Sequence, residues 1–357
     1  MTSLRWVKKY HYLKILIILL ILYWIYRTSN LEFKNTVHIL QQNQIYVKNN
    51  MITPWNACLE PYKFVIIVTS YVGHVELRSA HRRSMPIDYL RARNVTRFFL
   101  LARIPKTERF ITQEAIVDES NTFGDILQGS FYENYRNLTY KNLMGLQYAS
   151  SECNGASYIL KVDDDTVFNF ELTHNFLSKL PDNSQNPFML GYMLNNTSPI
   201  RLNQNKWYVT YEEYPLQKYP SYLSGWYYIT NPKTAAMICD EAPYHPYFWI
   251  DDILITGILT EYLNIRIQQL PRDYWLEHYE LLECCLRDMV KRKIKCNYVV
   301  GPNGGRHNLI VEFNDAYISC TNCAPRSITQ KLNETCVMFR DRTIFSDGKA
   351  EVHHIKL

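Results

Sequence analysis

Three consecutive carboxylates, Asp163, Asp164 and Asp165, follow the short apolar segment Tyr158–Val162. Hard divalent cations prefer carboxylate oxygens, and ligands of open α/β sheets bind at the carboxyl ends of strands. A solvated turn or a helix N-cap is the alternative for an isolated run of acids. The buried strand favours a site, because adjacent acids at its end repel one another without a counter-charge. We therefore predict that Mn²⁺ or Mg²⁺ binds here together with a diphosphate.

A second candidate for diphosphate binding follows an earlier apolar strand, Lys63–Thr69. After a turn, the segment Glu76–Ser84 begins a basic helix that carries Arg78 and Arg82. Arginine side chains at such a strand edge can bind a diphosphate through paired hydrogen bonds. An ordinary solvated helix face is the alternative interpretation.

The elements around these residues alternate between strand and helix. A strand over Arg97–Ala102 comes next, and apolar residues recur at helical spacing through Tyr135–Ala149, just before the acidic strand. Alternation of this kind predicts an α/β fold with a Rossmann-like, mostly parallel sheet flanked by helices.

The N-terminus contains an uninterrupted apolar run, Ile15–Tyr26, preceded by the basic residues Arg5, Lys8, Lys9 and Lys14. The positive-inside rule then places the N-terminus in the cytosol and the rest of the chain in the lumen. A cleaved signal peptide is the alternative, but no small-residue cleavage site follows. The predicted organisation is a cytosolic tail (1–12), a transmembrane anchor (13–26), a luminal stem (27–60), one folded domain (61–340) and a C-terminal tail (341–357).

The cysteines agree with a luminal location. All nine follow the predicted anchor, and the odd number leaves at least one without an intramolecular partner. Cys296, Cys320, Cys323 and Cys336 raise the alternative of a zinc site, but their uneven spacing and the oxidising compartment favour disulfides, whose pairing stays open. Glycosylation sequons, which are also all luminal, begin at Asn94, Asn137, Asn195, Asn196 and Asn333.

Charge argues against nucleic-acid binding. The formal net charge of +5 comes partly from the N-terminal tail, and the remaining basic residues are dispersed among acids. A nucleic-acid-binding domain would instead concentrate its basic residues in a patch.

Several further blocks occur in a fixed order between Lys63 and Gly257. They are Arg78-x-Ala-x-Arg82, Phe99-Leu-Leu, Asp125-Ile, Tyr135-x-Asn137-Leu-Thr-x-Lys141, Cys153, Lys161-x-Asp163-Asp-Asp165, Lys206-Trp207-Tyr, Tyr219-Pro-x-Tyr222-x-x-Gly225-x-x-Tyr228 and Asp251-Asp252. In this order they resemble glycosyltransferase family 31, the β-1,3-galactosyl- and N-acetylglucosaminyltransferases. The sequence departs from that family at Ser84 and Met85, where Thr-Trp is usual, and at Asp251, where Glu is usual.

The resemblance implies a GT-A-type fold and a set of site residues. Asp252 aligns with the catalytic base, although it could also cap the predicted helix Ile253–Leu263. A metal-binding histidine is usual beyond the base, and we assign that role to His307. The implied metal ligands are Asp165, Asp163 and His307, and the implied donor-binding residues are Arg78, Arg82, Asp125, Lys141, Lys161, Asp163, Asp164, Tyr222 and Gly225.

The resemblance also implies a reaction. We expect Mn²⁺- or Mg²⁺-dependent, inverting transfer of galactose from a UDP-sugar to a glycan on a glycoprotein or glycolipid, forming a β-1,3 linkage in the Golgi. UDP-N-acetylglucosamine is the alternative donor, and a non-catalytic luminal protein that binds glycans or nucleotides is the alternative class. A hydrolase is disfavoured because nothing in the sequence establishes the carboxylate spacing that it would need.

Overall fold

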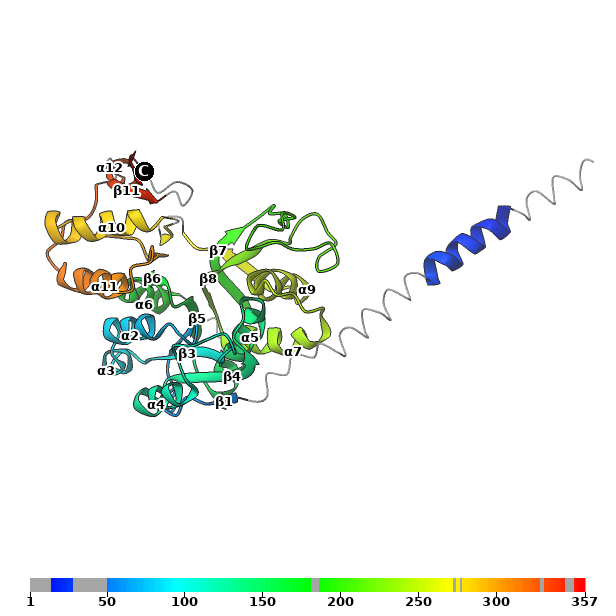
Figure 1. The fold of residues 1–357 in the computed structure, drawn as a ribbon, viewed down its shortest axis with the longest axis horizontal. Coiled ribbons are helices and arrows are strands. Elements are labelled where there is room, and N and C mark those ends of the chain that lie inside the picture. Colours follow the sequence, from blue (N-terminus) through cyan, green and yellow to red (C-terminus); the bar gives the residue numbers. More distant parts are fainter. Residues whose placement is uncertain are drawn as a thin grey trace, which may run out of the picture. The chain divides into compact units, whose positions relative to one another are not determined.

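A mixed β-sheet forms the centre of the fold (Figure 1). The computed structural model describes residues 14–27, 50–153, 155–180, 186–271, 274–276, 278–327, 331–343 and 350–356. Within these residues the sheet has eight strands, in the order β1 (Asn50–Ile52), β4 (Ile126–Tyr132), β3 (Val95–Arg103), β2 (Phe64–Thr69), β5 (Tyr158–Asp163), β8 (Tyr222–Thr230), β7 (Phe188–Leu194) and β9 (Arg266–Gln269).

The prediction of a mostly parallel sheet is confirmed only in part, because the sheet is mixed. The pairs β4–β3, β3–β2, β2–β5 and β7–β9 are parallel, whereas β1–β4, β5–β8 and β8–β7 are antiparallel. The strand and helix alternation used for the prediction ends at β5. Beyond β5, strand β8 follows β7 in the chain without an intervening helix. Consecutive strands of this kind pair antiparallel, because only parallel pairing requires a crossover connection.

Helices connect and cover the strands. In Figure 1, α2, α3 and α6 lie on one side of the sheet, and α5, α7 and α9 lie on the other. The helices are α2 (Val75–Ser84), α3 (Ile87–Arg91), α4 (Gln113–Phe123), η1 (Tyr135–Asn137), α5 (Leu138–Glu152), α6 (Phe170–Lys179), α7 (Pro232–Glu241), η2 (Ala242–Tyr244), α8 (Asp251–Ile253), η3 (Leu254–Ile258), α9 (Leu259–Tyr262), α10 (Tyr279–Arg287), η5 (Asp288–Arg292), α11 (Leu309–Ser319) and α12 (Leu332–Thr335).

Local sequence accounts for these elements. Every residue of β2 is buried, as expected for a run of apolar and β-branched residues covered by helices on both faces. Helix α4 begins after Thr112, whose side chain accepts a hydrogen bond from the Ala115 amide at 3.3 Å. It ends at Gly124, whose φ of 67° is unfavourable for residues with a side chain.

The predicted stem contributes its last residues to the folded domain. Strand β1 pairs with β4, and a disulfide joins Cys58 to Cys153 at the end of α5. The Asn56 amide also donates to the Gly124 carbonyl at 3.0 Å. Residues 50–60 therefore belong to this fold, whereas residues 28–49 of the predicted stem lie outside the described residues.

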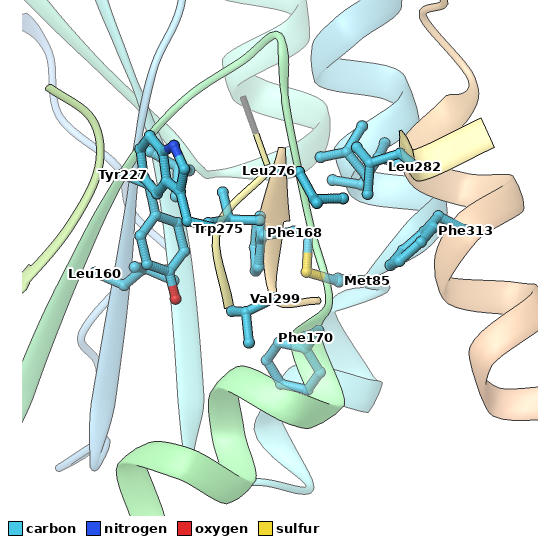
Figure 2. Close-up of a cluster of buried hydrophobic side chains, with 14 of the residues drawn as sticks. Met85, Leu160, Phe168, Phe170, Tyr227, Trp275, Leu276, Leu282, Val299 and Phe313 are labelled. Carbon is cyan, nitrogen blue, oxygen red and sulfur yellow. The ribbon is translucent and has the colours of Figure 1, made fainter. Parts of the chain in front are cut away.

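A hydrophobic cluster attaches the C-terminal elements to the sheet (Figure 2). Leu160 and Tyr227 come from β5 and β8, and Leu282 and Phe313 come from α10 and α11. In the same region, β6 (Thr166–Phe168) pairs with β10 (Val300–Pro302). The predicted C-terminal tail begins inside a hairpin, because β11 (Val337–Thr343) pairs with β12 (Ala350–Lys356).

The cysteines form disulfides rather than a zinc site. Besides Cys58–Cys153, the disulfides are Cys284–Cys336, Cys285–Cys296 and Cys320–Cys323. The four cysteines considered as zinc ligands are thus divided among three disulfides. Cys239 remains a free thiol.

The chain divides into two compact units, which we describe separately. All strands and the cavity below belong to the unit formed by Val47–Asp240 and Phe248–Leu357. The other unit comprises the described residues of Met1–Tyr46 and Glu241–Tyr247. In this second unit, residues 14–27 form a helix. The helix includes all of the predicted anchor, residues 13–26, except residue 13. Among the described residues, no helix has both the length and the apolar character needed to cross a membrane.

Candidate functional site

A cavity of about 1030 Å³ lies at the carboxyl ends of β2 and β5. The register of this parallel pair sets Thr69 beside Asp163, so the segments after both strands reach the same edge of the sheet. Both acidic clusters predicted from the sequence line the cavity, namely Asp163–Asp165 after β5 and Asp251–Asp252 in α8. The volume is at the upper end of the range for small-molecule sites, which suits a large polar ligand.

Lys161 holds the first aspartate of the triplet. Its buried Nζ atom lies 2.6 Å from Asp163 Oδ1 and also donates a hydrogen bond to the Gly225 carbonyl in β8. Burial raises the pKa of Asp163 to about 6, although the positive charge of Lys161 opposes the shift. A bound cation would therefore relieve an unfavourable concentration of negative charge at Asp163.

Asp164 anchors the acidic turn to the segment that follows β2. It accepts a hydrogen bond from Ser70 Oγ at 2.7 Å and lies 2.9 Å from His74 Nδ1, and its carbonyl oxygen lies 2.9 Å from His81 Nε2. Burial acts to raise the pKa of Asp164, but the hydrogen bonds from His74 and Ser70 outweigh it and lower the pKa. We infer that Asp164 is mainly structural.

Asp165 presents an exposed carboxylate to the cavity. Partial burial and the charge of Asp164 raise the pKa of Asp165. Its backbone is fixed, because its carbonyl accepts a hydrogen bond from the Asn303 amide at 3.0 Å beside the β6–β10 pair. Of the triplet, Asp165 is therefore the residue best placed to contact a ligand.

The arrangement fits a cation that takes few ligands from the protein. Within the described residues, no group of three His, Cys, Asp or Glu side chains is arranged to hold a metal ion. Mg²⁺ is commonly held through one or two carboxylates together with substrate phosphates and water. Asp163 and Asp165 supply two such carboxylates, and burial, with a smaller part from neighbouring aspartates, raises the pKa of both.

His307, which was predicted to complete the metal site, contacts Glu76 in the structure. His307 Nδ1 lies 2.7 Å from Glu76 Oε2, where both side chains are exposed, and His307 does not line the cavity. The histidine that does line it beside the aspartates is His74.

Asp252 lines the same cavity from α8, and β8 fixes its side chain. The Gly225 amide donates a hydrogen bond to Asp252 Oδ2 at 3.0 Å, and Thr256 Oγ1 donates to the Asp252 carbonyl at 2.6 Å. A Cβ atom at residue 225 would lie only 2.5 Å from Asp252 Oδ1. Glycine is therefore required here by close approach, and it leaves a carboxylate oriented for proton transfer.

Asp251 is buried and has a different character from Asp252. Burial and the negative charge of Asp252 raise the pKa of Asp251 to about 8. The Asn142 side-chain amide donates to Asp251 Oδ2, and Thr69 Oγ1 donates in turn to Asn142 Oδ1. This chain of hydrogen bonds connects α8 to the end of β2, although the sequence has Asp at position 251 where the family pattern usually has Glu.

Lys141 supports the cavity wall through a partner that the sequence did not reveal. Its buried Nζ atom forms an ion pair with Glu133 and donates a hydrogen bond to the Ser70 carbonyl at 2.7 Å. Lys141 thus holds Ser70, the first residue after β2, in position. The pair is buried, so removing either partner would leave an uncompensated charge.

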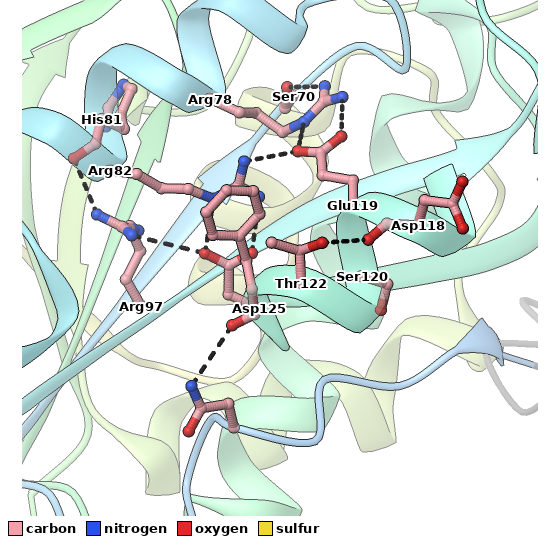
Figure 3. A network of polar contacts seen from close by, with 12 residues as sticks. Ser70, Arg78, His81, Arg82, Arg97, Asp118, Glu119, Ser120, Thr122 and Asp125 are labelled. Atoms are coloured by element: carbon pink, nitrogen blue, oxygen red, sulfur yellow. Dashed lines mark hydrogen bonds and ion pairs between the residues drawn. The ribbon is translucent and has the colours of Figure 1, made fainter. Parts of the chain in front are cut away.

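Arg78, Arg82 and Asp125 form a polar network away from the cavity lining (Figure 3). Arg78 and Arg82 both bind the Glu119 carboxylate at 2.7 Å, and Arg82 also binds Asp125 at 2.7 Å. These three residues were predicted to contact the donor, but their charged groups are already paired with one another or with Glu119. Arg78 reaches the site only indirectly, since it donates to Ser70 Oγ at 3.2 Å and to the Tyr71 carbonyl at 2.8 Å.

The aromatic residues divide into core and cavity-lining groups. Tyr219 and Trp249 are largely buried, whereas Tyr222 is partly exposed within the cavity. Tyr135 and Trp207 also line it. Both occur in the sequence blocks between Lys63 and Gly257, but the sequence analysis assigned them no role of their own.

Two further cavity residues were missed that a positional rule could have found. Ser70 and His74 follow directly after β2, and strand ends of neighbouring parallel strands meet at one edge. Applying that rule to both strands would have placed them beside Asp163–Asp165. Asn142 carried no comparable signal, because its partners Thr69 and Asp251 lie in distant parts of the chain.

Comparison with known proteins agrees with this site. Residues 77–271 match a family model described as galactosyltransferase. Human beta-1,3-galactosyltransferase 5 is 31% identical over 235 residues, which cover 64% of this chain and 74% of that protein. Human beta-1,3-galactosyltransferase 2 is 29% identical over 63% of this chain and 53% of its own length. The Drosophila melanogaster beta-1,3-galactosyltransferase brn is 29% identical over 58% of this chain and 63% of its own.

Proposed function

The chain belongs to the galactosyltransferase family, glycosyltransferase family 31, and is a glycosyltransferase; we propose that it transfers galactose from UDP-galactose to a glycan hydroxyl. The linkage formed is β-1,3, and the anomeric centre is inverted. One observation carries this proposal. A fixed carboxylate, Asp252, shares a single cavity with the acidic turn Asp163–Asp165.

Asp252 acts as the general base in this proposal. It accepts the proton of the acceptor hydroxyl as that oxygen attacks the anomeric carbon of the donor. The hydrogen bond from the Gly225 amide keeps its carboxylate oriented. A single base with no covalent intermediate gives inversion, so an α-linked donor yields a β-linked product.

Asp163 and Asp165 would hold Mn²⁺ or Mg²⁺ at the other cluster. When bound, such a cation neutralises negative charge on the departing diphosphate. Lys161 keeps Asp163 in position, and Asp164 fixes the acidic turn through Ser70 and His74. The protein's contribution at this end is thus to hold two carboxylates toward the cavity.

The membrane topology is also part of the proposal. We propose that the chain is a single-pass type II protein of the Golgi membrane, anchored through residues 13–26. Four disulfides support a luminal, oxidising environment for the folded domain. Protease protection in intact microsomes tests this. The folded domain should be protected until detergent is added, and cleavage without detergent would contradict it.

The test of the reaction uses the purified full-length chain with Mn²⁺ and either UDP-galactose or UDP-N-acetylglucosamine. Acceptors with terminal β-linked N-acetylglucosamine or galactose are supplied, and nuclear magnetic resonance of the product identifies the linkage. We expect galactose transfer that requires the metal and falls at least about 100-fold in Asp252→Asn. Transfer only from UDP-N-acetylglucosamine would show that N-acetylglucosamine, rather than galactose, is the sugar transferred. Binding of UDP without transfer from either donor would instead indicate the non-catalytic class.

A further inference from the structure

Two aromatic rings at the edge of the cavity remain uncovered. The side chains of Tyr135 and Trp207 line the cavity and are 40% and 50% exposed, respectively. They come from different parts of the chain, since Tyr135 begins η1 and Trp207 lies in the connection between β7 and β8. Exposed aromatic surface inside a ligand cavity is costly unless a ligand covers it.

The two rings are held together as one surface. Trp207 Nε1 donates a hydrogen bond to the Tyr135 hydroxyl at 2.9 Å. Tyr135 also packs against Trp249, with ring centroids 5.9 Å apart, and the Lys206 ammonium lies 4.3 Å from the Tyr135 centroid. These contacts orient both rings before any ligand arrives.

The segment that carries Trp207 is long but braced. Residues 195–221 join β7 to β8 without a helix, and connections of this length within a compact domain are commonly functional. The Arg201 guanidinium donates hydrogen bonds to four carbonyl oxygens of this segment, those of Val209, Thr210, Tyr214 and Leu216. Glu213 adds an ion pair to Arg136 beside Tyr135. Trp207 is therefore presented on a fixed connection.

This aromatic surface lies beside the segment that leads into α8, since Tyr135 packs against Trp249. Burial and then the charges of Asp252, Asp251 and Asp163 raise the pKa of Tyr135 to about 12, although the hydrogen bond from Trp207 opposes the shift. By contrast, the charged neighbours of His74 are Asp164, Asp165 and Arg78. A hydrogen bond gives the same placement. Thr139 Oγ1, at the start of α5, donates to the carbonyl of Phe248 at 2.6 Å, and Phe248 lies just before α8.

We propose that Tyr135 and Trp207 form a subsite that stacks against a pyranose ring of the acceptor glycan. This rests on the proposed function, in which the acceptor hydroxyl must approach Asp252. A pyranose ring has an apolar face of C–H groups and a rim of hydroxyls, and it can cover an aromatic ring while its hydroxyls remain hydrogen-bonded. Lys206 lies at this surface and can donate hydrogen bonds to those hydroxyls.

The alternative occupant is the uracil ring of the donor, which also stacks on aromatic side chains. The contacts of the rings disfavour it, because Tyr135 packs against Trp249 in the segment that leads into α8, whereas the diphosphate is proposed to bind at Asp163–Asp165. The two occupants make different predictions, since one changes acceptor affinity and the other changes nucleotide affinity.

The experiment measures transfer kinetics with the full-length chain carrying Trp207→Ala, Trp207→Phe or Tyr135→Phe. We expect Trp207→Ala to raise the acceptor KM about tenfold and to leave the KM for UDP-galactose within twofold. Trp207→Phe keeps a ring and should fall between Trp207→Ala and the unaltered protein. Tyr135→Phe keeps its ring but loses the hydrogen bond to Trp207, so it should show a smaller rise. Phe110→Ala is the matched control, because Phe110 is 97% exposed and does not line the cavity.

Binding of a β-linked acceptor to Asp252→Asn in the presence of UDP is measured separately by ligand-observed nuclear magnetic resonance. Adding Trp207→Ala should weaken this binding about tenfold. An unchanged acceptor KM and unchanged binding in Trp207→Ala would overturn the subsite while leaving the proposed reaction intact. A rise in the KM for UDP-galactose alone would also overturn it, in favour of nucleotide stacking. If no donor supports transfer, the proposed function fails, but the binding measurement still decides whether Trp207 contacts a glycan.

Discussion

Replacing Gly225 with alanine should displace the carboxylate of the proposed base, Asp252, while Asp252 itself stays unchanged. The added Cβ atom would lie 2.5 Å from Asp252 Oδ1, whereas ordinary contact begins at 3.4 Å. The carboxylate must therefore move by about 0.9 Å, the difference between those distances. It would also strain or lose the 3.0 Å hydrogen bond from the residue 225 amide.

The expected magnitude follows from this displacement. A misplacement of about 1 Å at a reacting group costs on the order of 100-fold in rate. This corresponds to about 2.7 kcal/mol in the activation free energy. Overpacking should also lower the free energy of unfolding by about 1–3 kcal/mol. The backbone itself tolerates alanine, because Gly225 lies within β8 and does not have a positive φ.

The assay compares kcat for galactose transfer at saturating UDP-galactose and acceptor, with thermal denaturation used to confirm folding. Gly155→Ala is the control, since its added Cβ meets nothing closer than 3.4 Å. The double variant Gly225→Ala/Asp252→Asn should be no slower than Asp252→Asn alone, because both changes act through one carboxylate. A kcat for Gly225→Ala within about threefold of the unaltered protein would refute the proposed dependence on the position of Asp252.

Three further predictions concern Asp251, His81 and the disulfide of Cys58. Asp251→Asn should retain much more activity at pH 7 than Asp252→Asn, because burial and the charge of Asp252 raise the pKa of Asp251 to about 8 and an amide replaces a protonated acid; equal losses in initial rate would contradict this. Burial lowers the pKa of His81 to about 4, whereas the pKa is about 6.5 in the unfolded chain. The contribution of neutral His81 to the free energy of unfolding is therefore fully present above pH 6.5 and is lost as the pH falls toward 4. Between pH 7.5 and pH 4, urea denaturation should show the unaltered protein losing up to about 3 kcal/mol more than His81→Gln, and equal losses would exclude His81 as the cause. Replacing Cys58 and Cys153 together with serine should lower the free energy of unfolding by about 2–5 kcal/mol, since the disulfide spans a sequence separation of 95, and an unchanged melting temperature would contradict this.

The polar network around Arg78 shows how tertiary contacts bear on a role predicted from a motif. The arginines occur where the family pattern places them, and the sequence predicted that they bind the donor. In the structure their charges are neutralised by Glu119 and Asp125, and Arg78 acts on the site through Ser70 and Tyr71. Glu119 lies 41 residues after Arg78, so no local pattern could reveal that pairing.

The sequence by itself determined the features that depend on neighbouring residues. The apolar runs of β2, β3 and β5, the helical spacing of α5 and the acids after β5 are local signals, because burial periodicity and chain direction act over a few residues. The ordered blocks added the enzyme family, which the comparisons confirmed.

Only the tertiary structure decided which distant groups meet. It placed Gly225 against Asp252, 27 residues apart, set Trp207 beside Tyr135, 72 residues apart, and paired His307 with Glu76, 231 residues apart. It also decided the mixed character of the sheet through the pairing of β5, β7 and β8. These contacts depend on strand order and on the path of long connections, and the packing that selects them acts on the whole chain rather than on any local segment.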